Sequence, residues 1–379
     1  MKLDPEVLVE PVFIVSAVRT PIGKFGGTLA GMTAADLGVI AAKAAIERAG
    51  ITADRIEESI FGNARQAGGG PNPGRQIGYR AGVPESSPAY TINKACASGM
   101  KAIALAYQEI MLGNADCILA GGAESMSRVP YFVEGARWGI RMGNQELVDA
   151  MYRDGFFDPL SKMLMGATAD KLGKQYNITR EEQDCFALIT QQRAEAATKE
   201  GRFRNELVPV EVQEKKATRS FDLDEHIRFG ATIESMAKLA PVFNKDGTVT
   251  AGNSSGITDG AAATVLVSGR KVKEWGLKPL ARIVDYSSAG VDPSIMGIGP
   301  VPATRKLLAK INWKIADFDL VELNEAFAAQ VLACDRELHF DRDKLNVNGG
   351  AIALGHPIGC TGTRIVVTLL HALDRKSVV

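Results

Sequence analysis

The sequence has 379 residues, of which 46% are apolar, and at about 150 residues per domain this length suggests two or three packed units. Its 44 basic residues balance 44 acidic ones, so the total charge gives no reason to expect binding to nucleic acid or to an anionic membrane surface. The 39 glycines and the aromatic content of only 6% favour an α/β protein with many tight turns over an all-β sandwich.

Residues 1–6 contain no apolar stretch of a signal peptide, and no run in the sequence reaches the ~18 apolar residues of a membrane span. Residues 377–379 are not a peroxisomal signal. We therefore expect a cytoplasmic protein. The five cysteines include no C-x-x-C pair and the four histidines no pair at i, i+4, so neither a disulfide framework nor a metal site is predicted.

The first part of the chain alternates short apolar runs with helical patterns. We predict helices near 34–49 and 97–113, and strands at 13–18, 57–62, 88–93 and 116–121. Such alternation is typical of a largely parallel sheet that is covered by helices.

The character of the sequence changes between residues 123 and 247, where it becomes charged and rich in helical and loop patterns. A helix is predicted to begin at Thr179, because Glu182 follows at the spacing of a capping box. We expect this segment to form an inserted cap over the sheet. The strand pattern returns at 261–267.

A second alternating series begins near residue 279. Strands are predicted at 280–285, 318–323 and 345–352, followed by a helix at 361–373. The two series resemble each other: in each half a strand and a turn lead to a helix with a cysteine at its start, Cys96 or Cys360. In the first half another strand follows that helix, so a duplication predicts a closing strand that the second half of this sequence does not contain.

Cys96 is a candidate nucleophile because it lies at the junction of a predicted strand and a helix. Free N–H groups and the positive end of the helix dipole should lower the pKa of a thiol there and favour the reactive thiolate. A free cysteine is also commonly a small buried apolar residue. Position alone leaves both interpretations open.

His356 lies in a glycine-dense loop between a strand and a helix, where backbones can approach a ligand closely. Single histidines are often packing residues, but this loop matches the position of the Cys96 loop in the other half. A two-fold arrangement would bring both loops to one crevice at the carboxyl edge of the sheet. Asn324 follows the strand at 318–323 and is either a site residue or a simple helix cap.

A dinucleotide or ATP site is the main competing interpretation of an α/β chain. No turn of this sequence carries G-x-G-x-x-G or a P-loop. NAD and ATP are therefore not expected.

The sequence closely resembles the thiolases over essentially its whole length. The motifs that carry the resemblance are Asn-x-x-Cys-x-Ser-Gly at 93–99, Gly-Gly-x-Glu-Ser-Met-Ser at 121–127, Asn-x-Ser-Gly-x-x-Asp-Gly-Ala at 253–261, Asn-Glu-Ala-Phe at 324–327 and Asn-Gly-Gly-x-x-x-x-Gly-His-Pro-x-Gly at 348–359. The resemblance implies duplicated thiolase-type βαβαβαββ halves in a layered α-β-α-β-α arrangement. The N-terminal half would comprise 1–122 and 248–272, the inserted loop domain 123–247, and the C-terminal half 273–379.

The resemblance also implies a function. Thiolases form or cleave a 3-ketoacyl-CoA by ping-pong Claisen chemistry, and here acetoacetyl-CoA or a short- to medium-chain 3-ketoacyl-CoA is expected. Cys96 would carry the acyl group, His356 would activate Cys96, and Asn324 would hold a water of the oxyanion site. CoA thioesters would be the substrates, without a further cofactor, and a homodimer or homotetramer is implied. By position the substrate contacts would be Arg228, Ser235, Ser255, Leu164, Met296 and Phe327.

Two departures from the family pattern are visible. Leu164 precedes Met165 and Gly166, where biosynthetic members typically carry a histidine, so the acyl-chain preference stays open. The family's second catalytic cysteine lies in a Cys-x-Gly-Gly-x-Gly segment that this sequence does not contain, and Cys360 does not match that position. The alternatives are an active thiolase of which this is a part, a CoA-binding protein without condensing activity, and a condensing enzyme acting on acyl carrier proteins. The first is favoured because the other motifs are present.

Overall fold

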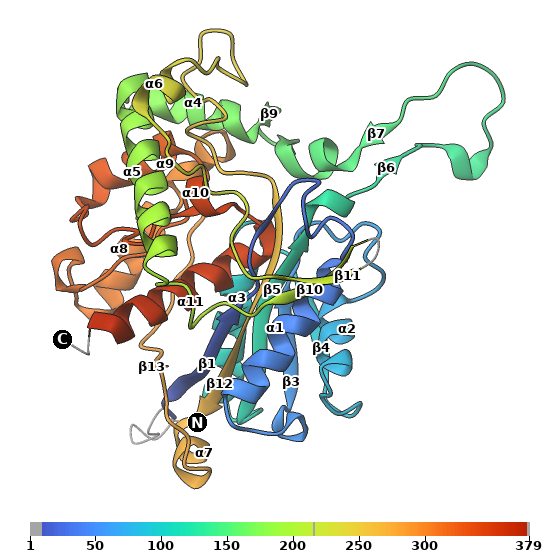
Figure 1. Ribbon diagram of the computed structural model, residues 1–379, viewed down its shortest axis with the longest axis vertical. Coiled ribbons are helices and arrows are strands. Elements are labelled where there is room, and N and C mark those ends of the chain that lie inside the picture. The colour runs from blue at the N-terminus through green and yellow to red at the C-terminus, as the bar shows by residue number, and fades with distance from the viewer. Residues whose placement is uncertain (1–9, 215–216, 377–379) are drawn as a thin grey trace, which may run out of the picture.

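The structure, a computed structural model, describes residues 10–214 and 217–376. A seven-stranded sheet forms the middle of one part of the molecule (Figure 1), in the order β13-β1-β12-β5-β3-β4, with β2 pairing with β12. β3 is parallel to both β4 and β5, and the other pairs are antiparallel. The strands are β1 (Val12–Arg19), β2 (Gly23–Lys24), β3 (Glu58–Gly62), β4 (Ala89–Ile92), β5 (Cys117–Ser125), β12 (Thr258–Ser268) and β13 (Ala281–Arg282).

Helices cover both faces of this sheet. α1 (Ala34–Arg48) and α2 (Pro73–Arg80) lie on one face, and α3 (Ser98–Met111) and α11 (Ile358–Lys376) on the other (Figure 1). Side chains alternate along each strand, so that in β5 Leu119 joins the core under α1 while Ile118 joins the core under α3 and α11. Because both faces are covered, β5 and β12 are buried at every position.

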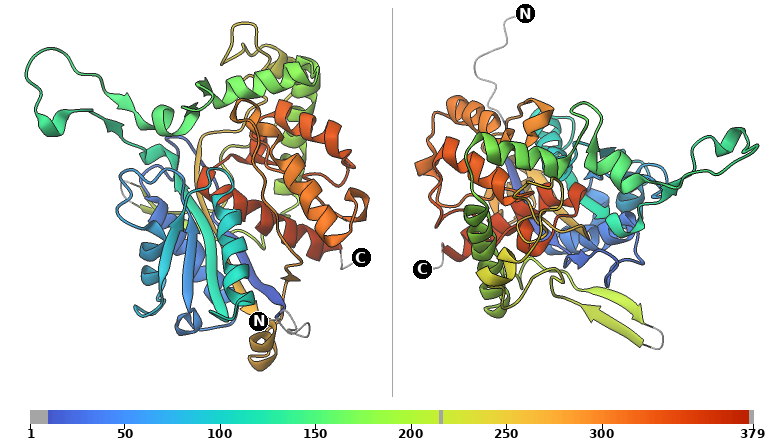
Figure 2. Two further views of the ribbon diagram at one scale, coloured as in Figure 1. Left: turned by 180° about the vertical axis from the view of Figure 1, so that it is seen from behind. Right: turned by 90° about the horizontal axis from the view of Figure 1, so that it is seen from above.

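A helical region lies on the far side of α11 from the sheet (Figures 1 and 2). Its core contains Leu172, Phe186, Val331 and Leu332, among other apolar side chains. The helices of this region are α4 (Met165–Gln175), α5 (Arg180–Lys199), α6 (Ile233–Ala237), α8 (Pro300–Ile311), α9 (Ala328–Leu338) and α10 (Ala351–Leu354). The short helix α7 (Gly269–Glu274) follows β12.

Three two-stranded hairpins lie outside the main sheet. β10 (Val210–Glu214) and β11 (Ala217–Phe221) pack on the α1 side, whereas β8 (Phe157–Asp158) and β9 (Met163–Leu164) precede α4. β6 (Tyr131–Phe132) and β7 (Val148–Asp149) form the base of a long arm that projects from the body (Figure 2). Residues 133–147 form the rest of this arm. The remaining short helices are the 3-10 elements Ala53–Arg55, Met126–Arg128, Ala136–Trp138, Pro293–Ile298 and Ile315–Asp317 and the π turn Tyr152–Phe156.

The predicted strands and helices of the first part are confirmed to within a few residues. The predicted helix start at Thr179 is also confirmed: the side chains of Thr179 and Glu182 cap each other's main-chain N–H groups. These elements were predictable because each carries its own periodic apolar pattern or cap.

The strands predicted at 280–285, 318–323 and 345–352 are largely wrong. Only two residues of the first form a strand, β13, and the other two segments meet in a single bridge between Val321 and Leu345. The last two residues of the third, 351 and 352, belong to helix α10. A strand needs a neighbouring strand to pair with its N–H and C=O groups. Among residues 10–214 and 217–376, no strand pairs with these segments over a longer stretch than this.

None of the described helices is both long enough and apolar enough to cross a bilayer. All five cysteines are free. The expectations that concern residues 1–6 and 377–379 fall outside the part of the chain that the structure describes.

Candidate active site

Cys96 lies in the turn between β4 and α3. Ala95, just before it, has a φ of 47°, a left-handed conformation that costs a residue with a side chain roughly 1–2 kcal/mol. The Ser98 hydroxyl stabilises this turn, since it donates to the Ala95 carbonyl at 2.7 Å and accepts from the Lys94 N–H at 2.8 Å. The turn therefore holds the Cys96 thiol, which is half-buried, in a defined place.

His356 approaches this thiol from the other end of the chain. Its Nε2 lies 3.1 Å from the Cys96 Sγ, although 260 residues separate the two. His356 is only 6% exposed, and its main-chain N–H donates to the Gly256 carbonyl at 3.1 Å. The expectation that the two loops meet in one place is therefore correct.

The partner of the other ring nitrogen determines the tautomer of His356. Nδ1 lies 2.7 Å from the Thr361 hydroxyl oxygen, and that hydroxyl donates its only proton to the Pro357 carbonyl at 3.0 Å. The hydroxyl oxygen must then accept from Nδ1–H. Nε2 is left with its lone pair toward Cys96, where it can accept the thiol proton.

Burial lowers the pKa of His356 to about 3, and the positive charges of Arg364 and Arg65 act in the same direction. Burial also raises the pKa of Cys96 above its ordinary value, which the Arg65 charge and a main-chain hydrogen bond offset only in part, while Glu124 adds to the rise. The resting pair is thus a neutral thiol beside a neutral imidazole. The expectation of a lowered thiol pKa is wrong, because burial disfavours the charged thiolate.

The thiol is surrounded by apolar side chains. Ala64, Met126, Met151 and Ile358 form a buried cluster against which Cys96 packs, together with Val129, Phe156 and Ile257. Arg65 adjoins this cluster, and its Nε is buried without a hydrogen-bond partner among the described residues. A Cβ on Gly155 would lie 2.6 Å from that nitrogen, so the backbone of Gly155 covers the guanidinium.

Asn324 is not a helix cap, because α9 begins at Ala328 with Phe327 in the cap position. Its Oδ1 is buried and accepts no hydrogen bond from the described part of the chain. No hydrogen bond joins Asn324 to Cys96 or His356 within that part. The neighbouring Glu325 is fully buried and accepts from Thr190, Asn346 and the Ile352 N–H, which ties the Asn324 segment to the His356 loop.

Two of the predicted substrate contacts, Met296 and Phe327, lie in one apolar cluster with Met165, Phe243 and Ala169, among others. Ser255 adjoins this cluster, since its N–H donates to the Ala326 carbonyl at 3.0 Å. Leu164 pairs with Phe157 in the β8–β9 hairpin and caps α4 just before Met165.

Arg228 and Ser235 lie at the surface. The Arg228 Nη2 donates to the Ala251 carbonyl at 2.9 Å, so its guanidinium is turned toward the segment that carries Ser255. Ser235 shares a capping box with Thr232 at the start of α6. Both residues lie on segment 228–239, and the Arg228 contact makes segment 248–255 its neighbour in the fold.

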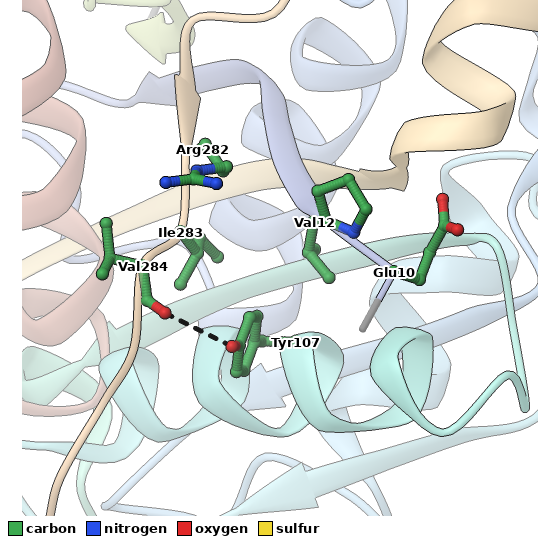
Figure 3. Close-up of a pocket in the computed structure, with 7 residues that line it drawn as sticks. Glu10, Val12, Tyr107, Arg282, Ile283 and Val284 are labelled. Carbon is green, nitrogen blue, oxygen red and sulfur yellow. Dashed lines mark hydrogen bonds between the residues drawn. The ribbon is translucent and has the colours of Figure 1, made fainter. Parts of the chain in front are cut away.

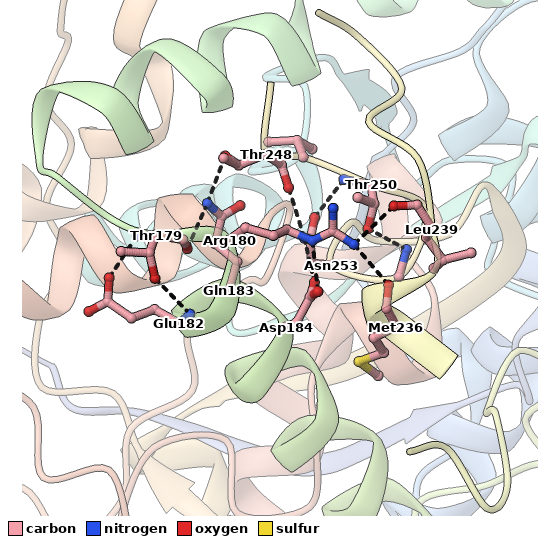
Figure 4. Close-up of polar contacts among 12 residues, drawn as sticks. Thr179, Arg180, Glu182, Gln183, Asp184, Met236, Leu239, Thr248, Thr250 and Asn253 are labelled. Atoms are coloured by element: carbon pink, nitrogen blue, oxygen red, sulfur yellow. Dashed lines mark hydrogen bonds and ion pairs between the residues drawn. The ribbon is translucent and has the colours of Figure 1, made fainter. Parts of the chain in front are cut away.

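The start of α5 binds both segments (Figure 4). Arg180 pairs with Asp184 at 2.7 Å and donates to the Met236 and Leu239 carbonyls at 2.8 and 3.0 Å. Asn253 donates to Asp184 at 2.9 Å. One buried carboxylate therefore links the two segments on which Arg228, Ser235 and Ser255 are predicted to bind CoA.

Other parts of the molecule offer less chemistry. Cys360 is buried in the core under α3 and α11, where burial raises its thiol pKa to about 12. No group of His, Cys, Asp and Glu side chains within 10–214 and 217–376 is arranged to hold a metal ion. A hollow of about 180 Å³ beside β13 (Figure 3) contains none of the predicted site residues; it is lined by Glu10, Pro11, Val12, Tyr107, Arg282, Ile283 and Val284.

Two residues that bear on the Cys96–His356 pair were not among the predicted site residues. Thr361 selects the tautomer of His356, and Glu124 accepts a hydrogen bond from the start of α11, which begins two residues after His356. A signal for Glu124 was available, because it is the single charged side chain of the buried strand β5. Thr361 offered no comparable signal.

Comparisons with known proteins agree with this geometry. The family models "Thiolase, N-terminal domain" and "Thiolase, C-terminal domain" match residues 12–270 and 277–378. The chain is 52% identical to an acetyl-CoA acetyltransferase of Cupriavidus necator, over 96% of this chain and 93% of that protein. It is 53% identical to an acetyl-CoA acetyltransferase of Chromobacterium violaceum, with the same two coverages.

Solved structures are similar as well. The human mitochondrial 3-ketoacyl-CoA thiolase superimposes with a TM-score of 0.94 at 45% identity, over 98% of this chain and 94% of that one. Another structure of the human enzyme, similar at the same TM-score, is a complex with CoA. The acetyl-CoA acetyltransferase from Syntrophomonas wolfei gives a TM-score of 0.95 at 46% identity, over 97% and 94% of the two chains.

Proposed function

Because the chain belongs to the thiolase family and is an acyltransferase, we propose that it transfers acyl groups between CoA thioesters through an acyl-cysteine at Cys96. The observation that carries this proposal is the 3.1 Å contact between His356 Nε2 and Cys96 Sγ. A half-buried thiol with a raised pKa needs a base to become a nucleophile, and a neutral imidazole with a free lone pair is such a base.

The first half-reaction follows from this pair. As Sγ attacks the thioester carbonyl carbon, the thiol proton passes to His356 Nε2, and a new C–S bond to Cys96 forms. The C–S bond to CoA then breaks, and the departing CoA sulfur takes the proton back from Nε2. Both the enzyme and the released CoA end neutral at sulfur, and His356 returns to its starting tautomer. The Asn324 Oδ1, which lacks a partner in the described chain, supports a role in holding a water beside the developing oxyanion.

The surroundings of the thiol support an aliphatic acyl group. Met126, Met151 and Ile358 pack against Cys96, so an acyl chain would replace water with apolar contact. The names of the curated relatives make acetyl-CoA the first substrate to test. No cofactor beyond the CoA thioester is part of the proposal, since thiol and imidazole supply both nucleophile and base.

The CoA portion is proposed to lie along segments 228–239 and 248–255. Arg228, Ser235 and Ser255 would contact it, and Met296, Phe327 and Leu164 would flank the pantetheine. The proximity of these two segments supports a shared role. A CoA-binding protein without catalysis is not favoured, because such a protein has no need for a histidine aimed at a cysteine.

We also propose that the protein self-associates and resides in the cytoplasm. The arm carries strongly exposed apolar side chains, Trp138 at 86%, Met142 at 91% and Leu147 at 68%, and exposed apolar surface of this kind commonly marks a subunit interface. The five free cysteines suit a reducing compartment. Light scattering on the parent and on a variant with Trp138 and Met142 replaced by serine would test the association, and a monomeric parent would contradict it.

The decisive test of the acyl-cysteine is peptide mass spectrometry after incubation with acetyl-CoA. We expect the acetyl mass on the peptide that contains Cys96, and brief treatment with hydroxylamine should remove it, because hydroxylamine cleaves thioesters. In Cys96→Ser we expect no hydroxylamine-sensitive acetyl mass. His356→Ala should fold and slow the acylation by roughly two powers of ten. Label on Cys117 or Cys360 instead would overturn the proposal.

A further inference from the structure

Glu124, at the end of β5, is fully buried, yet its carboxylate accepts four hydrogen bonds. Oε1 accepts from the Asn63 side-chain amide at 2.6 Å and from the Arg65 N–H at 3.0 Å. Oε2 accepts from the Ala64 N–H at 3.0 Å and from the Gly359 N–H at 2.8 Å. The donors come from two segments nearly 300 residues apart, so this side chain joins distant parts of the fold.

The first of these segments is the start of α11. Gly359 is the second residue of this helix, where main-chain N–H groups have no partner within the helix. It follows His356 by three residues, and Glu124 caps the helix from another element. The approach is close, because a Cβ on Gly359 would lie 2.7 Å from the Asn63 Cα, and one on Gly122 only 2.2 Å from the Gly359 carbonyl oxygen.

The second segment, 63–65, leads to the nucleophile. The Asn93 side-chain amide donates to the Ala64 carbonyl at 3.3 Å, and its oxygen accepts from the Ala95 N–H at 3.1 Å. Ala95 is the residue with positive φ that immediately precedes Cys96. A short series of hydrogen bonds thus runs from the Glu124 carboxylate to the turn that holds the thiol.

We propose that Glu124 is a positioning residue that ties the start of α11 to the turn of Cys96 and thereby sets the separation of Cys96 Sγ from His356 Nε2. The effect of Glu124 on catalysis rests on the proposed role of Cys96 as the acylated nucleophile. Each carboxylate oxygen accepts hydrogen bonds from two N–H donors, whereas an amide NH₂ group can only donate. A glutamine at this place would turn an NH₂ group toward two donors and push the two segments apart.

The charge of Glu124 has a separate and opposite effect. Three groups with a charge or a proton to exchange act on the thiol: Arg65, Glu124 and His356. Of these, Glu124 raises the pKa of Cys96. Removing its charge should therefore make Cys96 easier to ionise, while removing its hydrogen bonds should make the pair less able to react. These opposing effects separate positioning from a general loss of structure.

The test compares Glu124→Gln with the parent in two measurements. Single-turnover acylation by acetyl-CoA should slow by about 10- to 100-fold, the size expected for a displacement of reacting groups near 1 Å. The pH profile of Cys96 alkylation by iodoacetamide, read on the Cys96 peptide, should shift to lower pH. Glu124→Asp, which keeps the charge but is too short to reach both segments, should acylate slowly with an unshifted profile.

Asp335→Asn is the matched control. Asp335 is also a buried carboxylate that accepts a main-chain N–H, from Phe340 at 3.0 Å, but it lies in α9. It should keep the acylation rate and alkylation profile of the parent. Parental acylation in folded Glu124→Gln or Glu124→Asp would overturn the proposal, and so would an equal loss in Asp335→Asn. If Glu124→Gln does not fold, Glu124→Asp decides. Failure of the parent itself to acylate Cys96 would instead refute the proposed function.

Discussion

The Thr361 hydroxyl accepts a hydrogen bond from Nδ1 of His356 at 2.7 Å, and this contact leaves Nε2 unprotonated toward Cys96. Thr361 lies on the same helix whose start Glu124 caps. The contact with Thr361 thus orients the His356 ring, and the contact of Glu124 with the start of α11 fixes its position.

Thr361→Val should slow acylation of Cys96 by about 10-fold, because it leaves a buried Nδ1–H without an acceptor and frees the other tautomer, at a cost of ~1–3 kcal/mol. Thr361→Ser should restore most of the rate. Single-turnover acylation with acetyl-CoA measures both. Thr363→Val is a close control, since Thr363 is also fully buried in α11 but its hydroxyl has no partner in the described chain. Equal losses in the two valine variants would contradict a role for the tautomer.

The pH dependence of acylation should lack the inflection of an ordinary histidine near pH 6.5. Because the pKa of His356 is lowered to about 3, the ring stays neutral and able to accept a proton throughout pH 5–8. Alkylation of Cys96 should have a midpoint above the ordinary thiol value of about 8.5, since burial raises its pKa. Rate profiles between pH 5 and 10 test both statements. A fall in acylation centred near pH 6.5 would show that the imidazole titrates normally.

The depressed pKa of His356 also affects stability. In the unfolded chain this ring takes up a proton below about pH 6.5, whereas in the folded protein it does so only near pH 3. The unfolded state therefore binds more protons in this window, so stability should fall as the pH decreases from 6.5 toward 3. Urea unfolding at pH 7 and pH 5 measures the change, and His356→Ala should show a smaller decrease than the parent. An equal decrease in the two proteins would assign the pH effect to other groups.

Arg228→Ala should raise KM for acetyl-CoA by about 10-fold, the loss of one charge-assisted contact worth ~1.5 kcal/mol, with kcat little changed. The reason is that Arg228 is exposed and oriented by the Ala251 carbonyl, so its loss would remove the proposed CoA contact but no core packing. Steady-state kinetics with acetyl-CoA measure the effect. Arg305→Ala, another exposed arginine but on α8, serves as control. A fall in kcat with an unchanged KM would argue that Arg228 supports the chemistry.

Arg180→Ala should have a similar effect on KM by an indirect route. Arg180 does not need to touch CoA, because it holds the Met236 and Leu239 carbonyls beside Asp184. Losing it should loosen the segment with Ser235, raising KM by about 10-fold while kcat changes less than about twofold. Arg193→Ala is a matched control on the same helix.

Arg193 also donates to two main-chain carbonyls, but those of Leu345 and Arg342 at a different surface. It should reduce stability without raising KM. The same KM increase in both variants would mean that α5 acts only through the overall stability of the helical region.

Most of the fold of the first part was predictable from local pattern, whereas in the second part only the helix predicted at 361–373 is confirmed, as α11, and the strands are not. The runs that became β1, β5 and β12 each carry a complete apolar pattern and have partners on both sides. The segments at 318–323 and 345–352 have equally apolar patterns, but a strand exists only where a neighbour pairs with it. Pattern alone does not supply that neighbour.

The candidate site divides in the same way. Cys96 and His356 could be predicted because each precedes a helix at an equivalent place in the two halves. The contacts of Thr361 and Glu124 could not, because they depend on how α11 docks against β5. The direction of the thiol pKa was predicted wrongly because the sequence around Cys96 does not reveal its burial, which raises the pKa.

The separation of 260 positions between Cys96 and His356 bears on how activity arises during folding. The turn of Cys96 is built from contacts among neighbouring residues, but its base arrives only when α11, close to the end of the described chain, docks on the sheet. Until then the thiol has no proton acceptor and stays unreactive toward thioesters. Acylation of Cys96 by acyl-CoA would therefore report that these two distant segments of the chain have come together.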